Sequence, residues 1–189
     1  MKNKILVLAF VVGCLALSAW GTTAYFTHEG TATNVITAGD VAIELQETAV
    51  LEGGGDPVPF EDVIGVMPGT EVSKIVEVKN TGGNAAWVRI ILDKDILLAD
   101  GAEGEVDLSL ISCDLNTEYW TEKEGCYYYN TALEPGKTTE PLFTKVMFAQ
   151  TMSNMYQHSK AVIQVDAQAT QTANNGETVF DAVGWPDAE

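Results

Sequence analysis

Hydrophobic and polar residues alternate with period two in several stretches that follow residue 40. The clearest stretches are 41–46, 87–92 and 161–170. Such alternation predicts β-strands that turn one face to a core and the other to water. Less regular strands are expected at 72–79, 126–130 and 142–148. No long stretch has helical periodicity, although residues 151–159 suit a single helical turn.

Turn-forming residues separate these strands. Pro68-Gly69 and Pro135-Gly136 fit the central positions of a type II turn, where proline sets φ and glycine accepts a positive φ. The Asn-Thr-Gly-Gly-Asn segment at 80–84 follows the strand that contains Lys74, whose side chain falls on the same face as those of Val76 and Val78. Short strands separated by turns predict an all-β fold, an antiparallel β-sandwich or barrel.

The first segment has the character of an export signal. Lys2 and Lys4 form a positive n-region, and no charged residue occurs from 5 to 27. We therefore predict a signal peptide. A retained transmembrane helix, which needs about 20 apolar residues, is the alternative, and an uncleaved signal would be the only contact of this chain with a membrane.

Three positions satisfy the small-x-small rule for signal cleavage, and they follow Ser18, Gly21 and Ala24. Composition alone does not choose among them. Val11-Val12-Gly13-Cys14 also fits a lipobox, which would make Cys14 a lipid-bearing N-terminus. The residues after Cys14 stay apolar through Leu17, so a small apolar residue within the signal is the simpler interpretation.

The rest of the chain divides into two expected parts. A β-sandwich domain is predicted at 25–173, with a flexible Gly-rich loop at 52–57. An acidic C-terminal tail is predicted at 174–189. It is expected to be loosely held, although four of its residues are suited to dock on the domain: Val179, Phe180, Val183 and Trp185.

The charge of the chain excludes one class of partner. Ten Lys and Arg residues face 27 Asp and Glu residues, which gives a formal charge of −17. A nucleic acid needs a basic footprint, so we expect no nucleic-acid partner. The chain has one arginine and two histidines. This disfavours catalysis by an imidazole proton relay and binding of a substrate by several guanidinium groups.

Removal of the signal would leave Cys113 and Cys126. Two cysteines in an exported chain predict one disulfide, Cys113–Cys126. Two buried free thiols are the alternative.

No motif for catalysis or for a cofactor stands out, so we predict no catalytic residue, no cofactor and no metal site. A zincin needs His-Glu-x-x-His, but His28-Glu29 is followed by Ala32 where the second histidine should lie, and His158 is distant in sequence. There is no Gly-x-Ser-x-Gly either, and export disfavours a reduced catalytic cysteine.

Two binding alternatives remain open. Carboxylates crowd one segment and would suit weak calcium binding, although a solvated acidic loop explains them as well. They are Asp93, Asp95, Asp100, Glu103, Glu105 and Asp107. Aromatic residues bracket the two cysteines and would suit a glycan site or, alternatively, a packed hairpin. They are Tyr119, Trp120, Tyr127, Tyr128 and Tyr129.

Several of these segments, taken in order, resemble the TasA/camelysin family of exported proteins of Gram-positive bacteria. The segments are Gly-Thr-Thr-Ala-Tyr-Phe-Thr at 21–27, Ile-Thr-Ala-Gly-Asp-Val at 36–41, Met-Pro-Gly at 67–69, Lys-Asn-Thr-Gly at 79–82, and 163–170. The chain resembles a divergent member, because the cysteine-bearing insertion and the acidic tail have no match in TasA.

The resemblance implies a fold, a processing step and a function. The fold is a jelly-roll β-sandwich, and a dedicated signal peptidase of the SipW type would cut between Ala24 and Tyr25. TasA-like members form extracellular biofilm fibres by passing an N-terminal strand to the next subunit, which implies a secreted structural protein that forms a homo-oligomer or fibre. Camelysin implies a surface metallopeptidase as the alternative, for which this sequence supplies no zinc motif.

Overall fold

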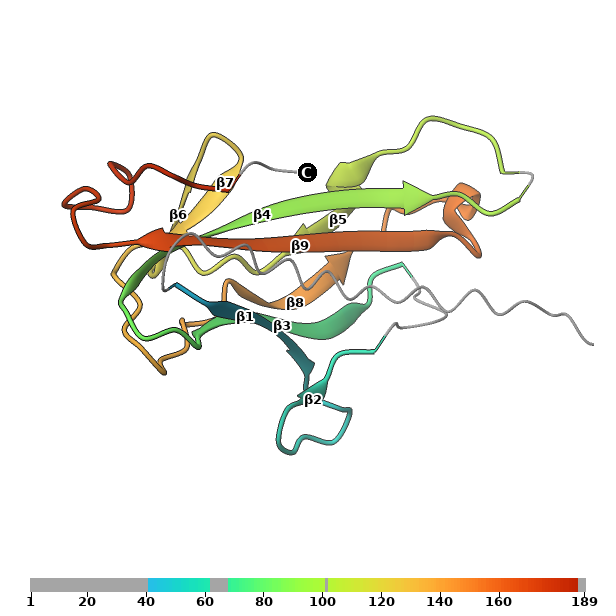
Figure 1. Ribbon diagram of the computed structural model, residues 1–189. Coiled ribbons are helices and arrows are strands. Elements are labelled where there is room, and N and C mark those ends of the chain that lie inside the picture. The colour runs from blue at the N-terminus through green and yellow to red at the C-terminus, as the bar shows by residue number, and fades with distance from the viewer. Residues whose placement is uncertain (1–40, 62–67, 101, 187–189) are drawn as a thin grey trace, which may run out of the picture. The chain divides into compact units, whose positions relative to one another are not determined.

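The structure is a computed structural model, and it describes residues 41–61, 68–100 and 102–186. These residues confirm the predicted all-β sandwich, in which two antiparallel sheets pack face to face (Figure 1). The strands are β1 (Ile43–Ala49), β2 (Val58–Pro59), β3 (Glu71–Asn80), β4 (Ala86–Leu97), β5 (Ile111–Cys113), β6 (Trp120–Lys123), β7 (Cys126–Tyr129), β8 (Phe143–Phe148) and β9 (Lys160–Gln171). The predicted signal peptide, the cleavage site at Ala24 and Tyr25, and Cys14 lie outside the described residues.

The order of strands is β2-β1-β3-β8-β5 in the first sheet and β6-β7-β4-β9 in the second. The chain crosses repeatedly from one sheet to the other between β3 and β9, as in jelly-roll sandwiches. Two short 3₁₀ helices join strands, η1 (Leu108–Leu110) and η2 (Asn154–Tyr156), and η2 lies within the expected helical turn. Within the described ranges, no helix is long and apolar enough to cross a membrane.

The core lies between the sheets and is built from the alternating apolar positions. Val76 and Val78 of β3, Val88 and Ile90 of β4, and Phe143 of β8 have no exposed surface. Most polar residues of the same strands face outward, because successive side chains of a strand point to opposite faces.

Two buried polar side chains belong to this inner face. Lys74 is 5% exposed, as its position beside Val76 and Val78 predicts. Its ammonium group lies 2.5 Å from a carboxylate oxygen of Glu47 and 3.9 Å from the ring centroid of Phe60. The pairing compensates a buried charge that would otherwise be costly, and it ties β1 and the segment after β2 to β3.

Asn80 organises the turn from β3 to β4. Its side-chain amide donates to the carbonyls of Asn84 and Leu133, each at 2.8 Å, and its side-chain oxygen accepts from the N–H of Gly82. The predicted turn at 80–84 is therefore confirmed. The predicted Pro-Gly turns are present as well, with φ of +80° at Gly69 and +73° at Gly136.

Residues 174–186, which we call the C-terminal strap, pack on the outer face of the second sheet. Val179 is 1% exposed and forms a second hydrophobic cluster with Trp87 and Tyr128. The Arg89 guanidinium lies 4.7 Å from the ring centroid of Trp185. The strap is thus a third layer held by packing rather than a loosely held tail. Of the four residues expected to be suited to docking, Val179 and Trp185 pack in this cluster, whereas Phe180 and Val183 are exposed.

Candidate functional site

The strand β9 forms one edge of the second sheet. Its neighbour β4 pairs with it continuously from Ala86–Gln171 to Leu97–Lys160. The N–H and C=O groups of Ala86 bond to Leu133 on the other side of β4, and the N–H of Thr172 donates to Ala85. Along an antiparallel strand, successive residues direct their backbone N–H and C=O groups alternately to the two sides of the strand. The even-numbered residues of β9 therefore bond to β4. The odd-numbered residues from 161 to 169 direct their N–H and C=O groups away from β4.

Nothing in the part of the chain that the structure describes pairs with this outer edge of β9. The adjacent strand of the first sheet, β1, also has an incompletely covered edge, since β2 pairs only with Thr48 and Ala49. β1 and β9 are in contact across the sandwich. The two edges together form one open side, which we call the β1/β9 side.

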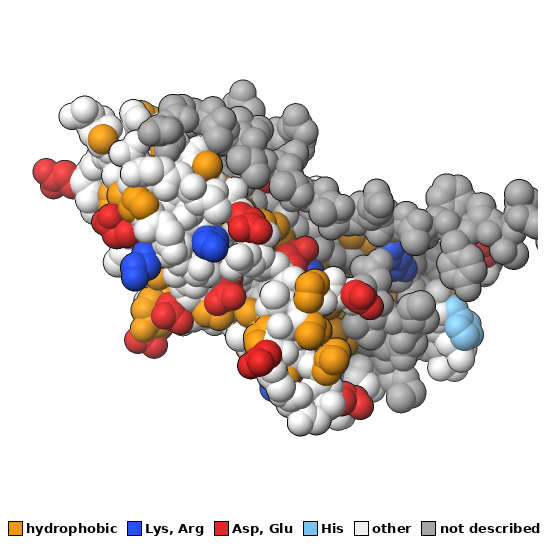
Figure 2. All heavy atoms as spheres, turned by 60° about the horizontal axis from the view of Figure 1, so that its bottom comes forward, with side chains coloured by type: hydrophobic (Ala, Val, Ile, Leu, Met, Phe, Trp, Pro, Cys, Tyr) orange, Lys and Arg blue, Asp and Glu red, His pale blue; other side chains and the backbone are white. Residues whose placement is uncertain are grey.

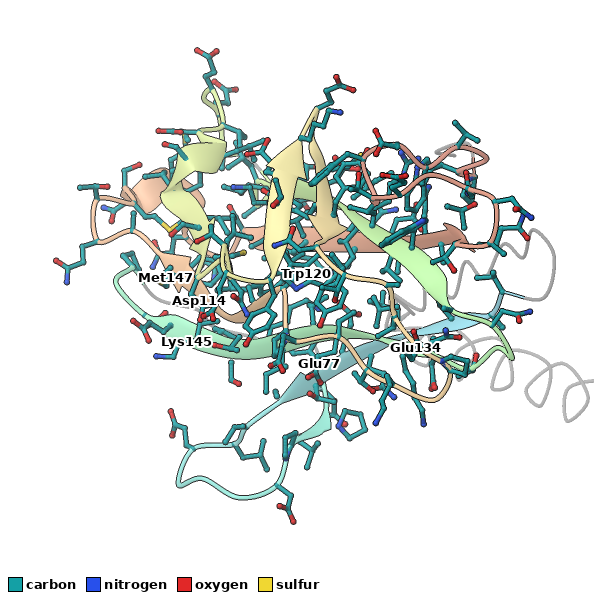
Figure 3. The ribbon with its side chains drawn as sticks, turned by 90° about the vertical axis from the view of Figure 1, so that its left-hand side faces the viewer. Glu77, Asp114, Trp120, Glu134, Lys145 and Met147 are labelled. Atoms are coloured by element: carbon teal, nitrogen blue, oxygen red, sulfur yellow. The ribbon has the colours of Figure 1, made fainter. Side chains whose placement is uncertain are left out.

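The opposite side of the sandwich, between β5 and β6, is closed by the chain itself. Residues 114–119 cross from one sheet to the other there, and the N–H of Asn116 donates to the carbonyl of Leu142 at 2.8 Å. The indole N–H of Trp120 donates to the carbonyl of Glu140 at 2.9 Å. Figure 3 labels Asp114 and Trp120, between which this crossing runs, and Lys145 of β8.

Asp114 fixes the start of that crossing. Its carboxylate accepts hydrogen bonds from the backbone N–H groups of Thr144 and Lys145 and from the Thr144 hydroxyl. Burial alone would raise the pKa of Asp114, but these hydrogen bonds outweigh it and hold the pKa below its usual value. Asp114 therefore closes this side as a carboxylate at neutral pH.

The N-terminal part of the chain meets the sandwich at the β1/β9 side. Val41 is 2% exposed, and the carbonyl of Ala42 accepts from the N–H groups of Thr81 and Gly82 in the β3–β4 turn. β9 ends at the same turn, where Thr172 bonds to Ala85. Val41 and Ala42, the first residues that the structure describes, therefore lie near the turn at which the open β9 edge ends. Sequence patterning predicted β9 as a strand but gave no signal for its edge position.

The predicted Cys113–Cys126 disulfide is wrong, because both cysteines are free thiols. Cys113 ends β5 and packs against the main core, whereas Cys126 begins β7 and packs against the cluster beneath the strap. The second sheet therefore lies between the two side chains. Burial raises the pKa of the Cys113 thiol, and the positive charge of Lys94 offsets only part of this rise.

The other candidate ligands do not converge within the described ranges. No group of three or more His, Cys, Asp and Glu side chains there is placed to hold a metal ion. This covers His158 and the carboxylates from Asp93 to Asp107, whereas His28 lies outside the described residues. The carboxylate of Asp107 instead caps η1 by accepting from the N–H and the hydroxyl of Ser109.

The aromatic residues near the cysteines do not share one exposed face. Trp120 and Tyr129 belong to the main core, with ring centroids 5.1 Å apart. Tyr128 faces the strap, and Tyr127 is half-buried. Only Tyr119 among the five is exposed, at 39%. Their placement is that of strand residues packed alternately on the two faces of a sheet.

Two like charges meet on the outer face of the first sheet. Glu77 of β3 lies opposite Gln46 of β1 on one side, and the segment that carries Glu140 bonds along β3 on the other. Burial first, and then the negative charge of Glu140, raise the pKa of Glu77. Glu77 is labelled in Figure 3.

Replacing Glu77 with Gln is expected to stabilise the fold at neutral pH. A raised pKa means that the folded state binds the proton more tightly than the unfolded chain, so ionised Glu77 costs stability above that pKa. Removing one of two facing like charges is worth about 0.2–1 kcal/mol. Urea unfolding at neutral and acidic pH should show this gain shrinking as pH falls through the raised pKa. An equal gain at both pH values would contradict the assignment.

Comparison of this chain with family models, with curated proteins and with solved structures found no match.

Proposed function

We propose that this protein is a secreted structural protein of the cell surface or biofilm matrix, which forms fibres when one copy passes its N-terminal segment to the next. The open β1/β9 side carries the proposal. A strand edge with unpaired N–H and C=O groups takes up an additional strand readily. The resemblance to the TasA/camelysin family and the export signal point to the same function.

The N-terminal segment has the composition of a donor strand. Residues 25–34, which a signal peptidase of the SipW type would free by cutting between Ala24 and Tyr25, are rich in Thr and carry one charged residue at neutral pH, Glu29. Ten extended residues span about 33 Å, against about 40 Å for the twelve residues of β9. Six residues, 35–40, remain as a linker to Val41.

Chain direction favours a donor from another copy. β9 ends near the turn at which Val41 lies, so residues 25–34 of the same chain, which lead toward Val41, can pair with β9 only in the parallel direction. Residues 25–34 of a second copy can also pair with it in the antiparallel direction. Antiparallel pairing is slightly the more stable. Donation from copy to copy in one direction does not close on itself, so it propagates as a fibre.

Charge sets the conditions for assembly. Removing Lys2 and Lys4 with the signal takes two positive charges from −17 and leaves −19. Acidic side chains are spread over the face shown in Figure 2, where basic ones are few. Salt at 0.15 M screens such repulsion beyond about 8 Å.

We expect mature protein to be monomeric at low salt and neutral pH, and to polymerise as salt rises or as pH falls toward the carboxylate pKa values of about 4. A chain that lacks residues 25–34 should stay monomeric in all of these conditions, because it has no strand to donate. Light scattering across salt and pH, with negative-stain microscopy of the scattering samples, measures this. Equal behaviour of the two chains would exclude strand donation and would indicate that residues 25–34 fold back onto their own domain.

A further inference from the structure

The C-terminal strap is closed by one side chain, that of Asn175. Its amide group donates to the hydroxyl of Thr170 at 3.0 Å and to the carbonyls of Gln171 and Val183, each at 2.9 Å. Its side-chain oxygen accepts from the N–H of Val183 at 2.8 Å. The backbone carbonyl of Asn175 accepts from the indole N–H of Trp87. The side chain is buried, with 6% exposure, and joins the end of β9 to both ends of the strap.

The residue after Asn175 is Gly176. A glycine offers no side chain to hinder attack by its own backbone nitrogen on the preceding asparagine. In that attack the nitrogen bonds to the side-chain carbonyl carbon of Asn175, ammonia leaves, and a cyclic imide forms. Water then opens the imide to aspartate or isoaspartate. Asn175-Gly176 is the only Asn-Gly pair in the chain.

We propose that Asn175, which holds the strap closed, deamidates once the strap has opened, and that this deamidation makes the opening permanent. In the closed strap the hydrogen bonds fix the carboxamide, so its carbon cannot swing toward the Gly176 nitrogen. Intramolecular attack needs the reacting atoms aligned at about 3–3.5 Å. The rate of modification is therefore set by how often the strap opens.

The modified side chain cannot restore the closed state. The amide group donates to three oxygen atoms, those of Thr170, Gln171 and Val183. A carboxylate has no hydrogen to give them and would place its negative charge among acceptors. The hydroxyl of Thr170 is already committed as a donor to the carbonyl of Val183. Deamidation therefore exposes the aromatic surface of Trp87 and Tyr128 beneath the strap.

The test compares deamidation of Asn175 in three samples incubated at mildly alkaline pH: the native chain, the Trp185→Ala variant and the native chain in denaturant. Trp185 packs on Arg89 and on the ring of Tyr128, and its indole N–H donates to the carbonyl of Ala182 rather than to Asn175, so its removal loosens the strap without altering the reacting groups. Peptide mapping by mass spectrometry measures the conversion. We expect conversion about tenfold faster in Trp185→Ala than in the native chain, as a loss of about 1.4 kcal/mol in opening free energy implies. Conversion in denaturant should be fastest. Asn154, which is exposed and followed by Met155, serves as an internal control in every sample.

The second measurement uses Asn175→Asp, which reproduces one of the two products of the modification. A protease that cleaves after aromatic residues should cut this variant rapidly at Phe180, while the native strap resists, and the fluorescence of Trp87 and Trp185 should shift toward that of exposed indole. Native Asn175 converting as fast as in denaturant would overturn the proposal. A protease-resistant strap in a folded Asn175→Asp protein would overturn it as well.

Discussion

A chain that ends at Ala173 is expected to lose on the order of 4 kcal/mol of its free energy of unfolding. Its strap would be absent, so Trp87 and Tyr128, now 8% and 9% exposed, would face water, and the burial of Val179 would be lost. Complete burial of one such apolar side chain is worth about 1.5–3 kcal/mol. The Trp87 indole N–H would also lose its acceptor, the carbonyl of Asn175.

Denaturant unfolding followed by tryptophan fluorescence measures this loss. A chain that ends at Pro186 is the matched control, because it keeps every strap contact described above, including the Pro186 carbonyl that faces Arg89 at 3.4 Å. Its stability should stay within about 0.5 kcal/mol of the full chain, as for most surface changes. If both truncated chains unfold at the same denaturant concentration, the strap contributes nothing to stability.

The strands were predictable because their signal is local. Alternation of apolar side chains at 87–92 and 161–170 depends only on which face is buried, so β4 and β9 followed from sequence alone. The same argument placed Lys74 on the inner face with Val76 and Val78, although its pairing with Glu47 depends on a neighbouring strand. Pro-Gly and Asn-x-Gly segments located the turns for the same reason, since φ preferences belong to single residues.

The open side, the strap and the orientation of the cysteines were not predictable, because each depends on contacts between distant segments. Alternation does not reveal which strand ends a sheet, so the edge position of β9 had no signal. The strap has no periodicity, and its closure depends on Asn175 meeting Thr170 and Val183. The count of two cysteines predicted a disulfide, but the chain between Cys113 and Cys126 crosses from one sheet to the other and leaves the two side chains on opposite faces of the second sheet.

Replacing Ala167 with proline is expected to abolish fibre growth while the domain stays folded. Ala167 lies in the middle of β9, and its N–H points away from β4 toward the open edge. Proline removes that N–H and is tolerated where a strand edge faces solvent. Gln168→Pro is the matched control, because the Gln168 N–H bonds to β4, so its loss leaves a β4 carbonyl without its partner and should destabilise the domain by about 1–3 kcal/mol. Thermal unfolding separates the two variants before any assembly is measured.

Mixing variants then tests the acceptor edge and the donor segment separately. Ala167→Pro keeps residues 25–34 and can donate but not accept, whereas the chain that lacks residues 25–34 can accept but not donate. Each alone should remain monomeric at a salt concentration that polymerises the native protein. An equimolar mixture should form a one-to-one complex and grow no further, since neither end of that complex can bind a third copy. Light scattering coupled to size-exclusion chromatography measures the mass. Fibres from folded Ala167→Pro alone would show that β9 is not the acceptor, and a mixture that stays monomeric would show that these two segments do not pair.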